Sequence, residues 1–330
     1  MTSRNRKERN MAQHLLKVRN IKKYFPIRSG LLRRTVGHVK AVDDVSFELA
    51  AGETLGIVGE SGCGKSTLGR MIMRVTDPTD GDILFEDVNL TQMSRTQLRS
   101  IRDRFQMVFQ DPYSSLNPRM NVGQILSEPL VIKGIRKKEA LEKAAGLLER
   151  VGLRARDLER YPHQFSGGQR QRIGIARAIS LNPKLIVADE AVSALDVSIQ
   201  SQILNLMMDL KHELNLAYIF ISHNLAVVRH ISARVGVMYL GSMVELGDKS
   251  DVYGSPLHPY TQALLASAPV ARREANRQRI VLEGELPNPA NPPAGCPFHP
   301  RCPQAMDICA RQKPALKEAA PRHSVSCHLY

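Results

Sequence analysis

The sequence predicts an α/β protein with a mainly parallel sheet, and three observations lead to this prediction. Strand and helix signals alternate from about Leu15 to Gly247, which is typical of strands joined by crossover helices. The segments 185–190 and 217–223 are short apolar runs that stop at polar residues, as buried strands do. Between them, residues 196–214 have the apolar spacing of an amphipathic helix.

The two ends of the chain differ from this pattern. Residues 1–14 are basic and polar with no apolar core behind them, so we expect a disordered tail and no signal peptide. From Pro287 to Pro303, seven of seventeen residues are proline, which excludes helix and central strand. We therefore expect one domain over 15–255 and an irregular, Cys/Pro-rich extension over 256–330.

Composition limits the partners without choosing one. The net charge of +14 permits nucleic acid, nucleotide phosphate or an anionic membrane surface. No apolar run approaches the roughly 20 residues that cross a bilayer. The sequence therefore predicts a cytoplasmic protein, whose thiols stay reduced unless they hold a metal.

A glycine-rich segment follows an apolar strand and opens a helix, and it matches G-x-x-x-x-G-K-[ST]. In this arrangement the glycines let backbone N–H groups surround a phosphate, and the helix N-terminus adds positive potential. Lys65 would reach the β- and γ-phosphates and Ser66 would hold Mg²⁺. The predicted nucleotide-binding residues are Gly59, Glu60, Ser61, Gly62, Cys63, Gly64, Lys65, Ser66 and Thr67.

A second apolar strand ends in two carboxylates, Asp189 and Glu190. Asp189 would ligate Mg²⁺ and Glu190 would polarise an attacking water. Many strands end in acids, so this pair is weak by itself. Together with the phosphate loop it predicts a hydrolytic nucleotide site.

A second helix N-terminus follows the small residues Ser166, Gly167 and Gly168, with helical apolar spacing at Ile173, Ala176 and Ile179. Such a terminus is suited to binding phosphate, yet one nucleotide site needs only one phosphate-binding helix N-terminus, which the phosphate loop already supplies. We therefore expect two subunits packed head to tail, each presenting this turn to the nucleotide of the other.

Six motifs in this order resemble the ATP-binding subunits of ABC transporters, from Leu15 to the C-terminus. They are Walker A at Gly59–Ser66, Gln110 in MVFQDPYSSLNP, the signature Ser166–Gln169, Walker B ending at Asp189 and Glu190, Asp196 in SALD, and His223 in ISHNL. The resemblance implies a P-loop NTPase (RecA-like) core with an ABC β-subdomain. It also implies an inserted α-helical subdomain at about 111–180, which would dock on the coupling helices of a transporter.

The same resemblance implies the roles of single residues. Gln110 would contact Mg²⁺ or the attacking water and sense the membrane partner, and His223 would contact the γ-phosphate. Phe25 would stack on adenine, with Tyr24 as the alternative. Phe165 replaces the usual leucine before the signature and Asn224 the usual aspartate after His223. Neither change removes a catalytic group, so an active ATPase that uses ATP and Mg²⁺ is expected.

The segment 256–269 and the cysteine-rich end resemble the oligopeptide/dipeptide (peptide/nickel) importer branch, and the basic insertion 28–42 resembles the second of its two paired ATPases. This implies hydrolysis that powers import of di- or oligopeptides from the cytoplasmic side of the membrane. The implied partners are a paralogous ATPase subunit sharing composite ATP sites, two membrane-spanning permeases and, indirectly, an extracytoplasmic substrate-binding protein.

Two alternatives stay open. The cargo could be a nickel chelate or an oligosaccharide in place of a peptide. The chain could also be an ABC ATPase that acts on nucleic acid, which the charge permits. The long coiled coils, tandem cores and aromatic platform of such proteins are missing from the sequence, so we expect no nucleic acid partner.

Four of the five cysteines form the pattern C-x5-C-x6-C-x17-C: Cys296, Cys302, Cys309 and Cys327. In a reducing compartment this favours a metal over disulfides. Zinc sites usually show close C-x2–4-C pairs, whereas a [4Fe–4S] cluster takes four cysteines at more varied spacing. The branch resemblance implies the cluster, with zinc or free thiols as alternatives, and we expect it to staple the extension. The fifth, Cys63, lies in the phosphate loop, where the backbone does the binding and a small side chain merely fits. A helix N-terminus can lower a thiol pKa, so alkylation of Cys63 would block ATP, an incidental property and not a regulatory one.

Overall fold

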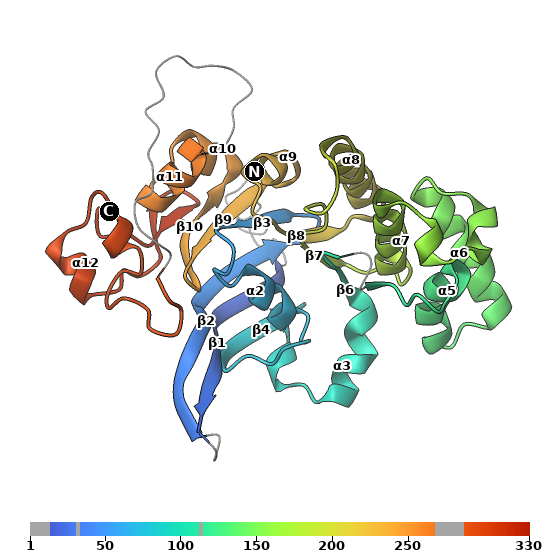
Figure 1. The fold of residues 1–330 in the computed structure, drawn as a ribbon, viewed down its shortest axis with the longest axis horizontal. Helices are drawn as coiled ribbons and strands as arrows, with labels where there is room; N and C mark the ends of the chain where they lie inside the picture. The colour runs from blue at the N-terminus through green and yellow to red at the C-terminus, as the bar shows by residue number, and fades with distance from the viewer. Residues whose placement is uncertain (1–13, 31–33, 112–114, 268–286) are drawn as a thin grey trace, which may run out of the picture. The chain divides into compact units, whose positions relative to one another are not determined.

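The computed structural model describes residues 14–30, 34–111, 115–267 and 287–330. The chain folds into two compact units (Figure 1). The first comprises the residues up to Ala50, Thr54–Gln92 and Ser222–Tyr330, and the second comprises Ala51–Glu53 and Met93–Ile221. Of the predicted basic tail, only its last residue lies within the described residues, as does all of the basic insertion except 31–33.

The first unit contains the strands and helices that begin and end the chain. In chain order they are β1 (His14–Ser29), β2 (Arg34–Ala50), β3 (Thr54–Val58), α2 (Lys65–Ile72), β4 (Asp80–Phe85), β5 (Val88–Asn89), the 3₁₀ helix η1 (Leu90–Gln92), α9 (Leu225–Ile231), β9 (Arg234–Tyr239), β10 (Ser242–Asp248), α10 (Lys249–Gly254), α11 (Pro259–Ser267), η5 (His299–Arg301), α12 (Asp307–Arg311), β11 (Lys317–Ala320) and β12 (His323–Val325).

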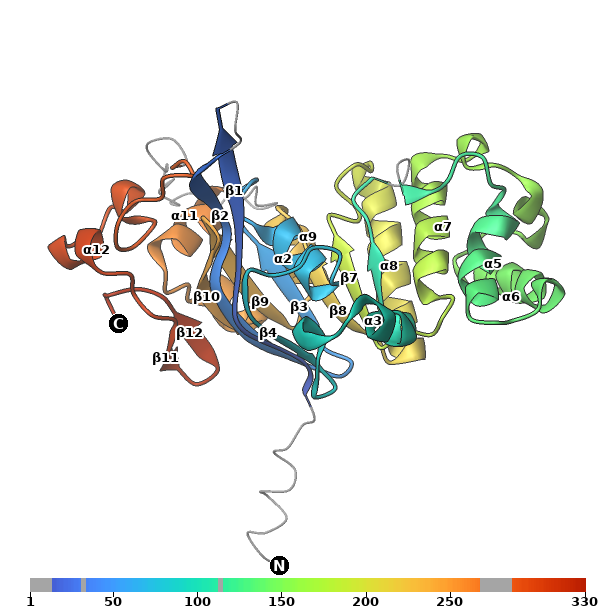
Figure 2. The ribbon, with the colours of Figure 1, turned by 90° about the horizontal axis from the view of Figure 1, so that it is seen from below.

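Two groups of strands organise this unit. The first is antiparallel, in the order β2-β1-β4-β5. Figure 2 shows β1 and β2 side by side as a long ribbon, and Tyr24 pairs with Lys40 within it. The second group has the order β11-β12-β10-β9-β3, in which only the pair β3–β9 is parallel. All five residues of β3 are buried, as expected of a strand covered on both faces.

The second unit contains the central part of the chain. Its elements are α3 (Arg95–Ile101), η2 (Arg102–Arg104), β6 (Phe105–Val108), α5 (Val122–Ile132), α6 (Lys137–Arg150), η3 (Ala155–Glu159), η4 (Pro162–Gln164), α7 (Gly167–Ile179), β7 (Leu185–Asp189), α8 (Val197–Leu214) and β8 (Ala217–Ile221).

The strands of the second unit are parallel, in the order β8-β7-β6, and every residue of β7 and β8 is buried. The two apolar runs that predicted strands at 185–190 and 217–223 are therefore confirmed. The predicted amphipathic helix is α8, and the apolar positions Ile173, Ala176 and Ile179 of α7 are buried as their spacing indicated. Among the described residues between β6 and β7, the regular elements are helices: α5, α6, η3, η4 and α7.

The C-terminal extension is more regular than its proline content predicted. Its last residues form β11 and β12, and β12 pairs with β10 through Glu245 opposite Val325. Prolines precede these strands and leave 315–327 free of proline except at position 321, which lies in the turn between them. The extension therefore continues a sheet of the first unit.

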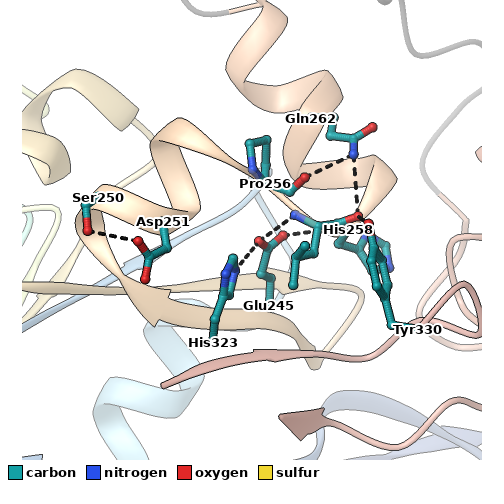
Figure 3. Close-up of polar contacts among 9 residues, drawn as sticks. Glu245, Ser250, Asp251, Pro256, His258, Gln262, His323 and Tyr330 are labelled. Atoms are coloured by element: carbon teal, nitrogen blue, oxygen red, sulfur yellow. Dashed lines mark hydrogen bonds and ion pairs between the residues drawn. The ribbon is translucent and has the colours of Figure 1, made fainter. Parts of the chain in front are cut away.

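A buried carboxylate fixes this junction, as Figure 3 shows. The carboxylate of Glu245 accepts hydrogen bonds from the backbone N–H groups of Leu257 and His258, each at 2.9 Å. Nε2 of His323, on β12, lies 2.7 Å from Oε1 of Glu245. One strand residue thus holds two separate segments of the extension.

Candidate nucleotide site and its surroundings

The phosphate loop needs glycine at three positions for different steric reasons. Gly59, Gly62 and Gly64 have φ values of 151°, 80° and 101°, which side chains rarely adopt. A Cβ on Gly59 would lie 2.2 Å from the carbonyl oxygen of Met238, and one on Gly64 would lie 2.0 Å from that of Ala41. The loop therefore packs backbone against backbone on two sides, so its N–H groups are held in place.

Lys65 begins α2 directly after this loop, as the motif predicted. Its side chain is buried, and Nζ donates to the carbonyl oxygens of Gly59 and Glu60, each at 2.8 Å. The ammonium group is therefore held within the loop by main-chain acceptors. Gly64 forms the N-cap of α2 without a side-chain hydrogen bond, so the N-terminal N–H groups of the helix are not capped by that residue.

The lowered thiol pKa that a helix N-terminus could give Cys63 is not found. Its thiol is buried, and burial raises its pKa although the nearby Lys65 ammonium acts in the opposite direction. Desolvation of the thiolate outweighs the interactions with Lys65 here. Cys63 is therefore a packing residue with a raised thiol pKa, and a Cβ on Gly59 would lie 2.8 Å from its Sγ.

The two candidates for adenine stacking differ in their surroundings. The ring of Phe25 is 41% exposed, with Nζ of Lys23 lying 5.0 Å from its centroid. Tyr24 donates its hydroxyl to Asp43 and lies opposite Lys40. Lys40 precedes Ala41, whose carbonyl touches Gly64, so this part of the β1–β2 ribbon lies beside the phosphate loop. An exposed ring offers a stacking surface, so Phe25 stays the candidate for adenine stacking and Tyr24 the alternative.

In the second unit, the structure brings together two of the predicted catalytic residues. Nε2 of Gln110 donates to Oε2 of Glu190 at 2.9 Å. Glu190 follows β7 with a left-handed φ of 47°, and its N–H donates to the carbonyl of Ile221 at the end of β8. Asp189, the last residue of β7, is buried. Residues 80 positions apart in sequence thus share one hydrogen bond at the carboxyl ends of the strands.

The signature residues form the N-terminus of α7. Ser166 is the N-cap: its Oγ accepts from the Gln169 N–H, and the Gln169 side chain accepts from the Ser166 N–H. This reciprocal pair is a capping box. A Cβ on Gly168 would lie 2.5 Å from Cγ2 of Ile199 on α8, so glycine is required there by helix packing. Ser166 is exposed, as is Asp196, the N-cap residue of α8.

His223 is exposed and lies in the first unit, just before α9. The next residue, Asn224, caps α9 by accepting from the N–H groups of Ala226 and Val227 at 3.0 and 3.3 Å. Asparagine offers the same acceptor as the aspartate usual at this position in ABC subunits. The departure noted in the sequence therefore leaves this helix start intact.

One contact at the phosphate loop was missed by sequence reasoning. The Glu60 carboxylate pairs with Arg301 of the extension, 241 residues later in the chain. Nothing in the local pattern around either residue indicates a partner at that distance. The contact becomes apparent only in the folded first unit, to which both the phosphate loop and the extension belong.

The four cysteines of the extension lie near one another. Burial raises the pKa of Cys296 to about 11, and the thiolates of Cys309, Cys327 and Cys302 add to this rise. The N–H of Cys296 also donates to the carbonyl of Cys309 at 2.7 Å. In the described part of the chain, however, no three Cys, His, Asp or Glu side chains are arranged as a metal-binding group. The expected iron–sulfur cluster or zinc site is not supported by this arrangement.

Two protein families match parts of this chain. Residues 42–193 match the family described as ABC transporter, and residues 244–309 match the one described as Oligopeptide/dipeptide transporter, C-terminal region. The oligopeptide transport ATP-binding protein AppF of Bacillus subtilis is 62% identical over 320 residues, covering 96% of this chain and 97% of AppF. The chain belongs to the ABC transporter family.

Other ABC transporter proteins extend this likeness. The dipeptide transport ATP-binding protein DppF of Haemophilus influenzae is 49% identical over 314 residues, covering 95% of this chain and 96% of DppF. The dimeric ATP-binding cassette MJ0796, solved in a post-hydrolysis state with ADP and Pi, shares 27% identity at a TM-score of 0.63, covering 71% of this chain and 98% of that one. CbiO1 of Clostridium perfringens has the same identity and TM-score, covering 74% of this chain and 92% of its own.

These matches confirm the predicted family, the ABC cassette fold and the ATPase class of this chain. None of the helices in the described residues is long and apolar enough to span a bilayer.

Proposed function

We propose that this ABC ATPase powers the import of di- or oligopeptides from the cytoplasmic face of a membrane, through permease subunits. The observation that carries the proposal is the match of residues 244–309 to the C-terminal region of oligopeptide/dipeptide transporters. This region contains the part of the extension that contacts the phosphate loop. Relatives named for oligopeptide and dipeptide transport match along almost the whole chain, which supports the same cargo class.

Nucleotide binding is assigned to the phosphate loop, to Phe25 and to the predicted Mg²⁺ ligands. Backbone N–H groups of the loop Gly59–Thr67, other than that of Glu60, which donates to the Tyr260 hydroxyl, would take the phosphates. Lys65 would be the counter-charge, and Phe25 would lie under the adenine ring. Ser66, Asp189 and Gln110 supply hydroxyl, carboxylate and amide oxygens, the donor types that suit Mg²⁺. When bound, Mg²⁺ neutralises charge on the β- and γ-phosphates.

Hydrolysis is assigned to Glu190, with Gln110 as its first partner. The carboxylate of Glu190 would accept a proton from the attacking water, a role that needs the ionised form. The hydrogen bond from Gln110 orients that carboxylate and links it to the segment that follows β6. A permease that displaced this segment would therefore change the position of the catalytic base. His223 is assigned to the γ-phosphate.

We assign the capped N-terminus of α7 to the nucleotide of a second ATPase subunit. Ser166, Gly167, Gly168 and Gln169 present backbone N–H groups at an accessible helix end, and Asp196 starts the helix packed beside it. In head-to-tail packing, the N-terminus of α7 in each subunit would face the nucleotide bound by the other subunit. A paralogous subunit is the proposed partner, since the basic insertion 28–42 resembles the second of two paired ATPases.

For the extension we propose an iron–sulfur cluster before zinc, on donor chemistry alone. Four neighbouring thiols are the ligand set of a [4Fe–4S] cluster. In the described part of the chain, the side chains of these cysteines do not form a metal-ligand group. About four irons and four sulfides per anaerobically purified chain would support the cluster. One zinc per chain would replace it with a zinc site, and absence of metal would overturn both.

Uptake by the reconstituted transporter tests the proposed function. The chain is assembled with its permeases and partner ATPase in proteoliposomes, and ATP-driven uptake of labelled di- and oligopeptides is compared with that of a nickel chelate and an oligosaccharide. Peptide uptake that disappears with Glu190→Gln supports the proposal. Uptake of another solute alone would overturn the cargo, and hydrolysis stimulated by DNA or RNA in place of peptide would overturn the transport role.

A further inference from the structure

The phosphate loop is held by the C-terminal extension at one residue, Glu60. The backbone N–H of Glu60 donates to the Tyr260 hydroxyl of α11 at 2.9 Å. Its carboxylate accepts from Arg301 of η5, with the Nη1 atom 3.1 Å from Oε2 and the Nη2 atom 3.4 Å from Oε1. Main chain and side chain of the same loop residue are therefore bound by two different elements of the extension.

Arg301 is itself held in a defined position. Its side chain is only 8% exposed, and Nη1 also donates to the Tyr239 hydroxyl at 3.4 Å. Phe298, three residues earlier, is fully buried, with its ring centroid 5.2 Å from that of Tyr239 and 5.4 Å from that of Tyr260. The aromatic residues that orient the guanidinium group thus also include the tyrosine that binds the Glu60 main chain.

The charge of Glu60 makes this contact relevant to ATP. Glu60 lies in a loop built to bind phosphate, where an uncompensated carboxylate would repel the triphosphate. Its side chain is 27% exposed, so solvent screens this charge less than it would on an open surface. A guanidinium group bound through both nitrogens neutralises the carboxylate and fixes its direction, which a single ammonium donor does less well.

We propose that Arg301 is a positioning residue for ATP binding, which neutralises Glu60 and orients the phosphate loop from the C-terminal extension. This rests on the assignment of Gly59–Thr67 as the nucleotide-binding loop. The extension is then a working part of the ATP site and not only an appended tail. Arg301 does not touch the reacting atoms, so its loss acts on nucleotide affinity before it acts on the rate of hydrolysis.

Nucleotide binding and steady-state hydrolysis by the purified full-length chain test this inference. In Arg301→Ala, we expect the Kd and KM for Mg·ATP to rise about tenfold, equal to about 1.4 kcal/mol, while kcat changes less than about twofold. Arg301→Lys should recover part of the affinity. Adding Glu60→Gln to Arg301→Ala removes the uncompensated carboxylate, so the double variant should bind ATP more tightly than Arg301→Ala.

Arg322→Gln is the matched control. Arg322 also joins the extension to the body of the first unit, through Asp248 at 3.0 Å, but away from the phosphate loop. It should leave Kd and KM unchanged. Thermal unfolding of each variant shows whether the chain remains folded.

The results separate this inference from the proposed function. A folded Arg301→Ala with wild-type Kd and KM would overturn the positioning role, as would a double variant no better than the single one. Wild-type chain that binds no Mg·ATP would instead remove the nucleotide-site assignment itself. If Arg301→Ala raises the Kd as expected but the transporter takes up no peptide, only the transport proposal is contradicted.

Discussion

Nε2 of His323 lies 2.7 Å from Oε1 of Glu245, and both side chains are almost completely buried. The same carboxylate accepts two backbone N–H groups from the segment before α11. Because a buried carboxylate needs such partners, this residue decides whether the extension stays on β10.

Removing Glu245 should therefore release the extension. In Glu245→Ala, the N–H groups of Leu257 and His258 and the imidazole of His323 lose their acceptor in a buried site. We expect the free energy of opening the β10–β12 pair to fall by about 3 to 5 kcal/mol. Hydrogen exchange of the 323–326 amides measures it. In a double-mutant cycle with His323→Ala the losses should be less than additive, and full additivity would show that the two residues do not interact.

His258 predicts a pH dependence of the same region. Burial lowers the pKa of His258 from 6.5 to about 3, and its Nδ1 accepts the Tyr260 N–H at 3.1 Å. The unfolded histidine binds more protons than the folded one below pH 6.5, so stability falls as pH falls from 6.5 towards 3. The slope should approach about 1.4 kcal/mol per pH unit as the unfolded histidine becomes fully protonated. Thermal unfolding between pH 7 and 5 measures it.

His258→Asn is the comparison for this experiment, because an amide oxygen can replace Nδ1 as acceptor without titrating. The variant should show a smaller loss of melting temperature over the same pH range. Equal slopes in both proteins would assign the pH dependence to other groups.

Glu190→Gln should separate ATP binding from turnover. The amide keeps an acceptor for Nε2 of Gln110 but cannot take a proton from water. We expect unchanged ATP affinity and a kcat at least about 100-fold lower. Glu149→Gln, on the exposed face of α6, is the matched control and should hydrolyse normally. Near-normal hydrolysis by Glu190→Gln would remove its assignment as the base.

Gly168→Ala tests the packing that shapes the signature. The added methyl group would lie 2.5 Å from Cγ2 of Ile199, and a β-branched side chain has little freedom to move away. We expect a loss of about 1 to 3 kcal/mol in stability and a matching loss of ATPase activity. Circular dichroism during thermal unfolding, together with phosphate release, measures both.

Two further variants decide the cause of that loss. Gly174→Ala lies in the same helix, where a methyl group would meet nothing within 4 Å, so it should be neutral or stabilising. Adding Ile199→Ala to Gly168→Ala should restore stability and ATPase activity, because it makes space for the added methyl group. Failure of this rescue would mean that the glycine is needed for a reason other than contact with α8.

The sequence predicted the local elements well where one short segment carries the whole signal. The strand before the phosphate loop, the buried strand ending in Asp189 and the apolar face of α7 follow from hydrophobic pattern and glycine position alone. The extension was predicted less well. Its proline count indicated irregular structure, whereas β11 and β12 form because β12 pairs with β10. The sequence could not decide the direction of the Cys63 pKa shift, because burial, which raises that pKa, is not a local property.

The sequence by itself determined the family and the chemistry: the glycine, lysine and carboxylate residues that a nucleotide hydrolase needs stand in one recognisable order. Only the tertiary structure decided which of these residues have partners. The hydrogen bond between Gln110 and Glu190 and the ion pair between Glu60 and Arg301 join residues 80 and 241 positions apart. Such contacts depend on where strands and helices pack, and packing is a property of the whole fold that no short segment carries.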